Sequence, residues 1–458
     1  MKKYRFFALL LAVALSLSLT VPAMALDDPQ PNCGAAIVVD GDHDEVLYAY
    51  HAYEKMYPAS VTKIMTSLVV LEAVDHGELS LDTPITASQQ AVTLPEGSST
   101  AGILAGEILT VEQLLYCDLV PSANEACNIL AEAVAGSNEA FVERMNAKAQ
   151  QLGMTGTHFT NPHGLHDPDH YTTAYDIYLM AKAAMEYDIF RTIVSTATYT
   201  LPATNLSEAR VLHSTNSLIS NWNVIGYQYS KAIGIKTGYT GEAGRCLAAA
   251  AVDDGRTFYS VVLGAENVVN EDNTVTYYSF EETIRLLEWA FDNFERMTLL
   301  DENSENVIRE VAVTLSDETD FVLAQPVGSI EATMPSDYDP AKAELRIDLP
   351  ESIQAPVTAG QELGTVSLVY DGVTYGTLPM VAADSVERSD FLYTVQMAQE
   401  YWSKWWVKAL VILVIVLIVV LILYLALIRP RRRRGGRRYS YSGSGRRRDS
   451  TYRGRRRR

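Results

Sequence analysis

A serine and a lysine three residues apart are the first groups in the chain whose spacing suggests chemistry. Ser60 and Lys63 stand where an apolar stretch begins, with Ile64 and Met65 directly after them. On a helix, positions i and i+3 lie on one face, so the hydroxyl and the amine can meet. Pro58 suits the first turn of a helix, and the N–H groups exposed there favour an oxyanion. The stretch therefore predicts a nucleophile, a candidate base and an anion site in one turn, although S-x-x-K also arises by chance.

Two later motifs make chance a poor explanation. Ser122-Ala123-Asn124 falls in a break between two helix-like stretches, and Lys236-Thr237-Gly238 lies in a strand-like run. Taken singly, Ser122 could cap the following helix and the second motif could be an ordinary strand end. In this order, however, S-x-x-K, S-x-N and K-T-G form the trio of penicillin-binding proteins and β-lactamases.

With these motifs the chain resembles the serine D-alanyl-D-alanine carboxypeptidases, the low-molecular-weight penicillin-binding proteins of peptidase family S11. The resemblance covers about residues 33–390. Besides the trio it includes residues 160–165, 170–176, 234–240, 355–357 and 360–364. It implies an α+β fold: a penicillin-recognising (β-lactamase-like) domain with a five-stranded antiparallel sheet, flanking helices and a helical lobe. A small all-β domain and a C-terminal transmembrane helix would follow.

The chemistry that this resemblance implies begins at Ser60. Its hydroxyl would attack the bond between the two terminal D-alanines of a peptidoglycan stem peptide, and water would hydrolyse the acyl-enzyme. A serine needs a base within hydrogen-bond reach, and Lys63 can serve only as a neutral amine. Burial and a second cation, Lys236, would both lower its pKa. Ser122 would relay a proton to the leaving amine, and Asn124 would orient Lys63 and the substrate amide.

The remaining site residues follow from the same resemblance. Lys236 and Thr237 would bind the terminal carboxylate, and Gly238 would let the substrate backbone lie along the strand edge. The backbone N–H groups of Ser60 and Tyr239 would form the oxyanion hole. One departure stands out: the family often has a carboxylate-binding arginine where this chain has Ser279. Another arginine, such as Arg245, could replace it.

The expected function is a D-alanyl-D-alanine carboxypeptidase that is acylated by penicillins and uses no cofactor. Three alternatives stay open: a DD-endopeptidase, a β-lactamase and a non-catalytic penicillin-binding sensor. Efficient class A β-lactamases deacylate through a loop glutamate, and no matching loop is found. The appended β domain also argues against a β-lactamase.

Both ends of the chain carry membrane signals. Residues 1–25 combine lysines and an arginine, an apolar run and an A-x-A site, which predicts a cleaved export signal. Residues 407–428 are apolar except for Lys408, long enough to span a bilayer, and follow a cluster of tryptophans. The tail, 429–458, holds 15 arginines and one acid. These features predict a single-pass protein of the cell membrane, with the catalytic domain on the extracellular face and the tail in the cytoplasm.

Between these ends we expect a catalytic domain at 26–298, a small all-β domain at 299–392 and a stalk at 393–406. The chain has a net charge of −19 although its tail is strongly basic, so the part between the two membrane signals is strongly acidic. The arginine tail favours orientation and contact with anionic lipid over nucleic acid, which is not an expected partner.

Cysteines and histidines add little. Cys33, Cys117, Cys127 and Cys246 show no disulfide or zinc spacing, and the two middle ones are expected to be buried thiols, although pairing stays open. A loop with His163, His166, His170, Asp167 and Asp169 resembles a metal cluster, but it matches a family segment that needs no metal. Asn205-Leu206-Ser207 fits the glycosylation pattern and is expected to be an ordinary loop.

Overall fold

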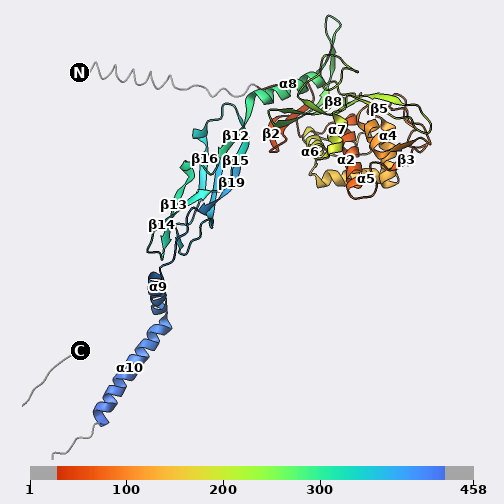
Figure 1. Cartoon of the computed structure of the whole chain (residues 1–458). Coiled ribbons are helices and arrows are strands. Elements are labelled where there is room, and N and C mark those ends of the chain that lie inside the picture. The colour runs from red at the N-terminus through yellow and green to blue at the C-terminus, as the bar shows by residue number, and fades with distance from the viewer. Residues whose placement is uncertain (1–27, 429–458) are drawn as a thin grey trace, which may run out of the picture. The chain divides into compact units, whose positions relative to one another are not determined.

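The computed structural model of the chain describes residues 28–428. The predicted signal peptide and the arginine tail therefore lie outside the described residues. Figure 1 shows an α+β arrangement in which the residues up to 293 form a sheet and a group of helices, followed by a run of strands and two C-terminal helices.

A five-stranded antiparallel sheet forms the framework of the first part. The two strands at one edge form a hairpin at residues 35–50, and a second hairpin, at residues 244–265, lies beside it. The strand order is β2 (Glu45–Tyr50), β1 (Ala35–Asp40), β9 (Arg256–Ala265), β8 (Gly244–Asp253) and β7 (Ala232–Thr240). β7, which carries the K-T-G motif, is thus an edge strand of this sheet.

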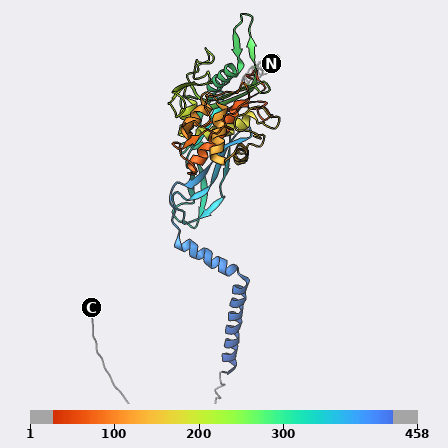
Figure 2. The ribbon, with the colours of Figure 1, turned by 90° about the vertical axis from the view of Figure 1, so that its right-hand side faces the viewer.

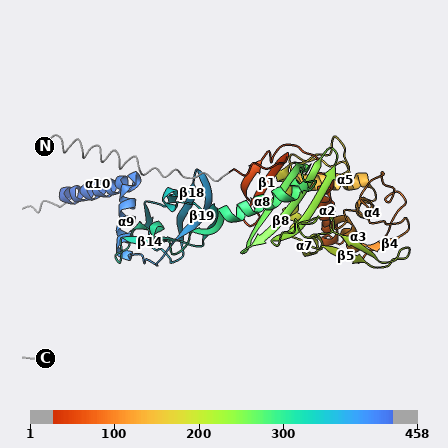
Figure 3. The same ribbon diagram turned by 90° about the horizontal axis from the view of Figure 1, so that it is seen from above.

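Both faces of the sheet are buried. Successive residues of β1 alternate between two apolar clusters, because side chains of a strand point to opposite faces: Ile37 belongs to one cluster and Val38 to the other. Helix α8 (Tyr278–Asn293) covers the second face through Phe280 and Leu287. The first face packs against the helical lobe, and Figures 1 and 3 show α8 and α2 on opposite sides of the sheet.

The helical lobe is built around α2 (Lys63–Asp75), in which nearly every residue up to Ala73 is buried. A helix that is buried all round must be surrounded by other elements, and four helices pack against it. They are α3 (Val111–Leu119), α4 (Asn124–Ala135), α5 (Asn138–Gln151) and α6 (Ala174–Met185), while α7 (Asp188–Val194) packs against α3, α6 and β7. Thr110 is the N-cap of α3 and forms a capping box with Gln113.

Ser60 does not lie in the α-helix itself. It sits in the 3₁₀ turn η1 (Ala59–Thr62), and α2 begins at Lys63. The turn starts from Ala59, whose φ of +47° is in the left-handed region that side chains disfavour. The expected helix after Ser60 is therefore confirmed, while its first turn is tighter than the sequence indicates.

Three short two-stranded sheets lie outside the central sheet in residues 28–293. They pair β3 (Pro84–Thr86) with β4 (Ile108–Thr110), β5 (Thr198–Leu201) with β6 (Arg210–His213), and β10 (Asn267–Val269) with β11 (Val275–Tyr277). The β10–β11 hairpin, coloured green, projects from the rest of this part in Figure 2.

The residues after α8 form mostly strands, as the sequence predicts. β12 (Phe294–Leu300) pairs with β15 (Ile330–Pro335). A six-stranded sheet has the order β16 (Glu344–Asp348), β18 (Glu362–Tyr370), β19 (Val373–Ala382), β14 (Phe321–Pro326), β13 (Arg309–Thr314) and β17 (Ser352–Gln354). Two further 3₁₀ turns are η2 (Glu305–Val307) and η3 (Pro340–Lys342).

Two helices end the described chain. α9 (Asp390–Ser403) occupies most of the predicted stalk, and α10 (Trp405–Ile428) contains the predicted span. Between them Lys404 has an extended backbone, with ψ of 127°. Within the described residues, one helix is long and apolar enough to cross a membrane, Trp405–Leu427, and its side chains are exposed.

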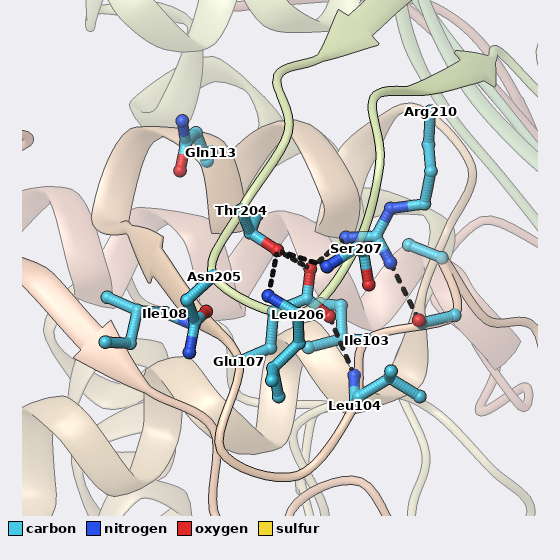
Figure 4. Close-up of polar contacts among 12 residues, drawn as sticks. Ile103, Leu104, Glu107, Ile108, Gln113, Thr204, Asn205, Leu206, Ser207 and Arg210 are labelled. Atoms are coloured by element: carbon cyan, nitrogen blue, oxygen red, sulfur yellow. Dashed lines mark hydrogen bonds and ion pairs between the residues drawn. The ribbon is translucent and has the colours of Figure 1, made fainter.

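An ion pair between a buried carboxylate and a partly buried arginine anchors the segment that leads into β4. Glu107 is fully buried, and its Oε1 lies 2.6 Å from Nη2 of Arg210 and accepts a hydrogen bond from Oγ1 of Thr204 at 2.8 Å. Its Oε2 accepts from the backbone N–H of Leu104, and Arg210 also donates to the carbonyl of Gly102 (Figure 4). The pair thus joins residues 102–107 to the 204–210 loop, which are distant in sequence.

We expect Arg210→Ala to lower the free energy of unfolding by about 3 kcal/mol or more, because the buried Glu107 carboxylate would lose its counter-charge. Chemical denaturation of the full-length protein in detergent measures this. Arg144→Ala is the matched control: its pair with Glu78 is about 40% exposed on both sides, so its removal should cost less than about 1 kcal/mol. Equal losses for the two variants would contradict the prediction.

Candidate active site

The amine of Lys63 lies directly beside the hydroxyl of Ser60. The distance from Nζ to Oγ is 3.1 Å, so the i, i+3 spacing brings the two groups together as predicted. Lys63 is fully buried, while Ser60 is partly exposed and lines a cavity of about 280 Å³. A candidate nucleophile thus faces the cavity with a candidate base behind it.

Two oxygen atoms hold the lysine amine on its other sides. Nζ of Lys63 donates to Oδ1 of Asn124 at 2.7 Å and to the backbone carbonyl of His163 at 2.7 Å. A neutral amine has two N–H groups and one lone pair. With both N–H groups directed at these carbonyl oxygens, the lone pair is left for the Ser60 hydroxyl. The contacts therefore suit a lysine that takes a proton from the serine.

Asn124 owes its position to two backbone features. It is the first residue of α4, and its own N–H donates to the carbonyl of Ser99 at 2.9 Å. Ser122, just before it, has φ of +67°, a conformation that costs energy for a residue with a side chain. The residues of the S-x-N motif are therefore held by the junction between α3 and α4, and Ser122 lines the same cavity as Ser60.

Strand β7 passes unusually close to the Ser60 turn. A Cβ atom on Gly238 would lie 3.0 Å from the backbone nitrogen of Ser60 and 2.9 Å from the carbonyl of Pro58. Gly164 makes a similar approach, since a Cβ there would fall 1.8 Å from the carbonyl of Ala59. Glycine at these positions lets a strand and a loop close on the turn from two sides. In the structure Gly238 has this packing role, in addition to the expected one toward substrate.

Lys236 lies inside the protein beneath β7 and does not line the cavity. It is 1% exposed, and its Nζ donates to the carbonyl of Thr237. Burial first, and then the charge of Lys63, lower the pKa of the Lys236 amine to about 7, against an opposing effect of Asp118. Both effects disfavour the charged form of Lys236, because burial removes its hydration and the charge of Lys63 repels it.

The cavity beside Ser60 is lined on its far side by groups that could bind an anion. Thr237 and Tyr239 of β7 face it, and Oγ1 of Thr237 lies 2.6 Å from Oγ1 of Thr215. Arg245 of β8 also lines it, with its guanidinium 4.1 Å from the centre of the Tyr239 ring. The buried Nε of Arg245 has no hydrogen-bond partner among the described residues. Ser279 lines the same cavity, close to where the arginine of the family was expected.

The histidine-rich loop is part of the scaffold of the site. His170 accepts the N–H of Thr160 through Nδ1, and its Nε2 lies 2.9 Å from Oγ1 of Thr62 in the Ser60 turn. Burial lowers the pKa of His170 to about 4 and that of His163 to about 3, so both rings are neutral. In the described part of the chain, no group of three or more His, Cys, Asp or Glu side chains is placed to hold a metal ion.

The four cysteines are free thiols, and three of them are fully buried. Cys127 donates to Oδ1 of Asp118 at 2.9 Å, and Cys246 lies against the carbonyl of Ala243. Burial raises the pKa of Cys33 to about 12 and that of Cys246 to about 11. These thiols stay protonated and are not placed as nucleophiles.

Several residues that contribute to the site were not predicted from the sequence. The carbonyl of His163 contacts Lys63 through its backbone, which no residue type signals. Thr215 pairs with Thr237 from a loop without a recognisable motif, and Asp118 lies on a helix whose pattern indicates only burial. The one sequence signal for these contacts was the family-like segment at residues 160–165. It indicated that this loop belongs to the site, but not that the carbonyl oxygen of His163 contacts Lys63.

Comparison with known proteins agrees with this geometry. The profile of the D-alanyl-D-alanine carboxypeptidases of peptidase family S11 matches residues 23–267, and that of the penicillin-binding protein 5 C-terminal domain matches residues 294–388. The chain is 32% identical to D-alanyl-D-alanine carboxypeptidase DacF of Bacillus subtilis, over 81% of this chain and 90% of that protein. It is 32% identical to DacC of Escherichia coli, over 80% of this chain and 87% of that one.

Solved structures give the same result. Penicillin-binding protein 5 from Haemophilus influenzae superposes with a TM-score of 0.60 and 27% identity, covering 80% of this chain and all of that one. The fold predicted from the motifs is therefore confirmed. The chain belongs to the serine-type D-alanyl-D-alanine carboxypeptidases of peptidase family S11, the low-molecular-weight penicillin-binding proteins.

Proposed function

We propose that the protein removes the terminal D-alanine from peptidoglycan stem pentapeptides through an acyl-enzyme on Ser60. The observation that carries this proposal is the position of the Lys63 amine, 3.1 Å from the Ser60 hydroxyl and held by two carbonyl oxygens. Ser60 Oγ attacks the carbonyl of the penultimate D-alanine while Lys63 takes its proton. Ser122 passes a proton to the departing amine, D-alanine leaves, and water hydrolyses the ester.

The backbone supports the charge that develops on the substrate. The N–H groups of Ser60 and Tyr239 form the proposed oxyanion hole, and the close approach of β7 at Gly238 supports this pairing. Asn124 keeps Lys63 oriented. The groups contacting Lys63 are an amide and a backbone carbonyl, whereas a class A β-lactamase directs a glutamate at its deacylating water. The contacts thus favour a peptidase.

The terminal carboxylate is the substrate group that distinguishes a carboxypeptidase. We assign it to Thr237 and to Arg245, since both residues line the cavity beside Ser60 and Arg245 brings a positive charge to it. The buried Lys236 contributes positive potential from beneath the strand. Arg245 would therefore replace the arginine that the family often has at the position of Ser279.

For the protein as a whole, we propose export by residues 1–25 and anchoring by α10. The catalytic domain would then lie on the extracellular face and the arginine tail in the cytoplasm. The long apolar helix and the family's peptidoglycan chemistry support this orientation. The domain limits 26–298 and 299–392 are likewise proposals, supported by the two family matches. β-Lactams would acylate Ser60 as inhibitors.

Ser60→Ala is expected to lower the rate of D-alanine release from a stem pentapeptide by on the order of 10⁴-fold, because no other group supplies the nucleophile. Free D-alanine is measured with the full-length protein in detergent, together with covalent labelling by a fluorescent penicillin. Ser195→Ala, an exposed serine at the end of α7, is the matched control and should leave both unchanged. Retained release or labelling in Ser60→Ala would refute the assignment.

Arg245→Ala is expected to lower kcat/KM for the pentapeptide by about 10- to 100-fold, the value of a lost hydrogen bond to a charged group. Measuring the effect of Arg245→Ala on a pentapeptide with a C-terminal amide shows how much of that effect depends on the substrate carboxylate. On the amide substrate, the wild type and the variant should differ little. Arg144→Ala controls for a general loss of positive charge. An equal loss on both substrates would show that Arg245 acts in another way.

A groove next to the cavity favours a second activity, the hydrolysis of cross-linked peptides. This groove, about 430 Å³ in volume, shares Thr215 and Asn223 with the cavity and starts at Pro121, beside Ser122. Its wall includes Trp222, which is 66% exposed and stacks on His213 with ring centres 3.5 Å apart. Ser122 is the proposed donor to the leaving amine, so the groove continues on the leaving-group side.

The chemistry of a cross-link fits this position. In a meso-diaminopimelate cross-link the leaving residue keeps an α-carboxylate, as D-alanine does, but its side chain carries a second stem peptide. That side chain would follow the groove along the Trp222–His213 stack while the carboxylate remains at Thr237 and Arg245. The groove thus supports a DD-endopeptidase activity beside the carboxypeptidase.

Trp222→Ala is expected to slow cleavage of a cross-linked muropeptide dimer by about tenfold, the effect of losing an aromatic contact of roughly 1.4 kcal/mol. Release of D-alanine from the pentapeptide should change less than about twofold. Tyr53→Ala, another exposed aromatic residue, is the control. Chromatography of the digested muropeptides measures both reactions. A wild-type enzyme that leaves dimers intact would rule out the second activity.

A further inference from the structure

Asp118 is a buried carboxylate close to the active site that the proposed mechanism does not use. It lies near the end of α3 and is fully buried. Burying an unpaired carboxylate is costly, so such a group needs donors or cations around it. Its surroundings therefore show what it does.

Two hydrogen bonds tie Asp118 to the helices that carry the catalytic lysine and its asparagine. Oδ2 accepts from Oγ of Ser67 at 2.8 Å, and Oδ1 accepts from Sγ of Cys127 at 2.9 Å. Ser67 lies four residues after Lys63 on α2, and Cys127 three residues after Asn124 on α4. At this spacing each donor is one turn from the residue that it follows, on the same helix face. Asp118 thus lies one turn beneath the Lys63–Asn124 contact and bridges both helices.

The charges around Asp118 are of the opposite sign. The titratable and charged groups that act on it are Lys63 from α2, Lys236 from β7 and Cys127 from α4. Cys117 precedes Asp118 on α3. The charge of Asp118 raises the pKa of this thiol, as do those of Glu107 and Glu125, while Arg210 lowers it. Both cysteines have pKa values raised by burial and are neutral, so the two lysines are the cations that face it.

Both carboxylate oxygens accept hydrogen bonds, which suits an ionised group. Burial is the largest effect on Asp118 and leaves its pKa raised, while Lys63, the two hydrogen bonds and Lys236 act in the opposite direction. A pair of lysines that are 0% and 1% exposed can keep one proton near neutral pH only if an anion offsets that charge. Of the acids described here, Asp118 acts on both lysines.

We propose that Asp118 is the counter-charge that holds one proton on the Lys63–Lys236 pair and so sets the pH at which Ser60 becomes nucleophilic. It is a positioning residue that acts through the two lysines and does not touch substrate. This inference rests on the proposed roles of Ser60 and Lys63. It adds that the pH range of the enzyme is set one turn below the site, by a residue outside all three motifs.

The consequence for pH has a definite sign. Acylation requires a neutral Lys63, so its rate should rise with pH through a midpoint as the lysine pair loses a proton. Lys236, whose pKa burial and the charge of Lys63 lower to about 7, belongs to this pair. Removing the negative charge of Asp118 makes that proton easier to lose. The midpoint should then move to lower pH by about one unit or more, the effect of one opposite charge at short range.

The test is the pH dependence of penicillin acylation and D-alanine release by the full-length protein in detergent, from pH 5 to 9. Asp118→Asn keeps the shape and an oxygen acceptor for Ser67 but loses the charge, and is expected to shift the midpoint as stated. Cys127→Ser is the matched control, because a hydroxyl can still donate to Oδ1 and the charge is unchanged. It should keep the wild-type midpoint.

The possible results distinguish a failure of the Asp118 proposal from a failure of the proposed function. A lower rate at every pH with an unchanged midpoint means that Asp118 is neutral or purely structural, and overturns the proposal. A wild type that neither releases D-alanine nor reacts with penicillin refutes the proposed function instead. Asp118→Ser is a second neutral variant if the asparagine does not fold, as judged by thermal unfolding. If neither folds, infrared spectra of wild type with ¹³C-labelled aspartate decide: a protonated Asp118 carboxyl at pH 7 overturns the proposal, and an ionised one supports it.

Discussion

The burial of the Lys63 amine is the constraint on which the rest of the site depends. A lysine in water keeps its proton at neutral pH and cannot accept one from a serine. Here the amine is removed from solvent, held by the side chain of Asn124 and the carbonyl of His163, and placed near a second buried lysine. Each of these partners comes from a different element: α4, the 158–174 loop and β7. The apolar helix α2 carries the lysine into the interior, so the packing of the helical lobe and the chemistry of the site are linked.

The site around Ser60 is closed by backbone segments that pack directly against the 3₁₀ turn, rather than by side-chain contacts. The edge strand β7 and the 158–174 loop reach the 3₁₀ turn because Gly238 and Gly164 leave room that a Cβ atom would fill. Ala59 and Ser122 take left-handed conformations that cost free energy and that the surrounding contacts maintain. Strain of this kind is tolerable where the lobe and the sheet fix both sides of the turn. The result is a serine that faces the cavity between two rigid elements.

The proposed anion site would use a different arginine from the one that the family often has. The family's arginine near the start of α8 is absent, since Ser279 occupies that position, yet Arg245 of the neighbouring strand lines the same cavity. Stacking on Tyr239 restrains the guanidinium without using its donors. The distant Glu107–Arg210 ion pair has a different role, because it joins residues 102–107 to the 204–210 loop.

Local spacing and composition alone predicted the all-β region, the apolar C-terminal helix and the Ser60–Lys63 pair, since i, i+3 neighbours meet on any helical turn and alternating residues define the faces of a strand. The order of the motifs indicated the family, and the central sheet with its flanking helices was implied by the resemblance to that family. Tertiary structure decided the rest: that the carbonyl of His163 holds Lys63, that Lys236 lies beneath its strand, that Arg245 reaches the cavity, and that Asp118 lies under the lysines. The reason is physical. Backbone carbonyls carry no residue signature, and a pKa depends on burial and on charges brought from distant segments, which exist only once the chain has folded.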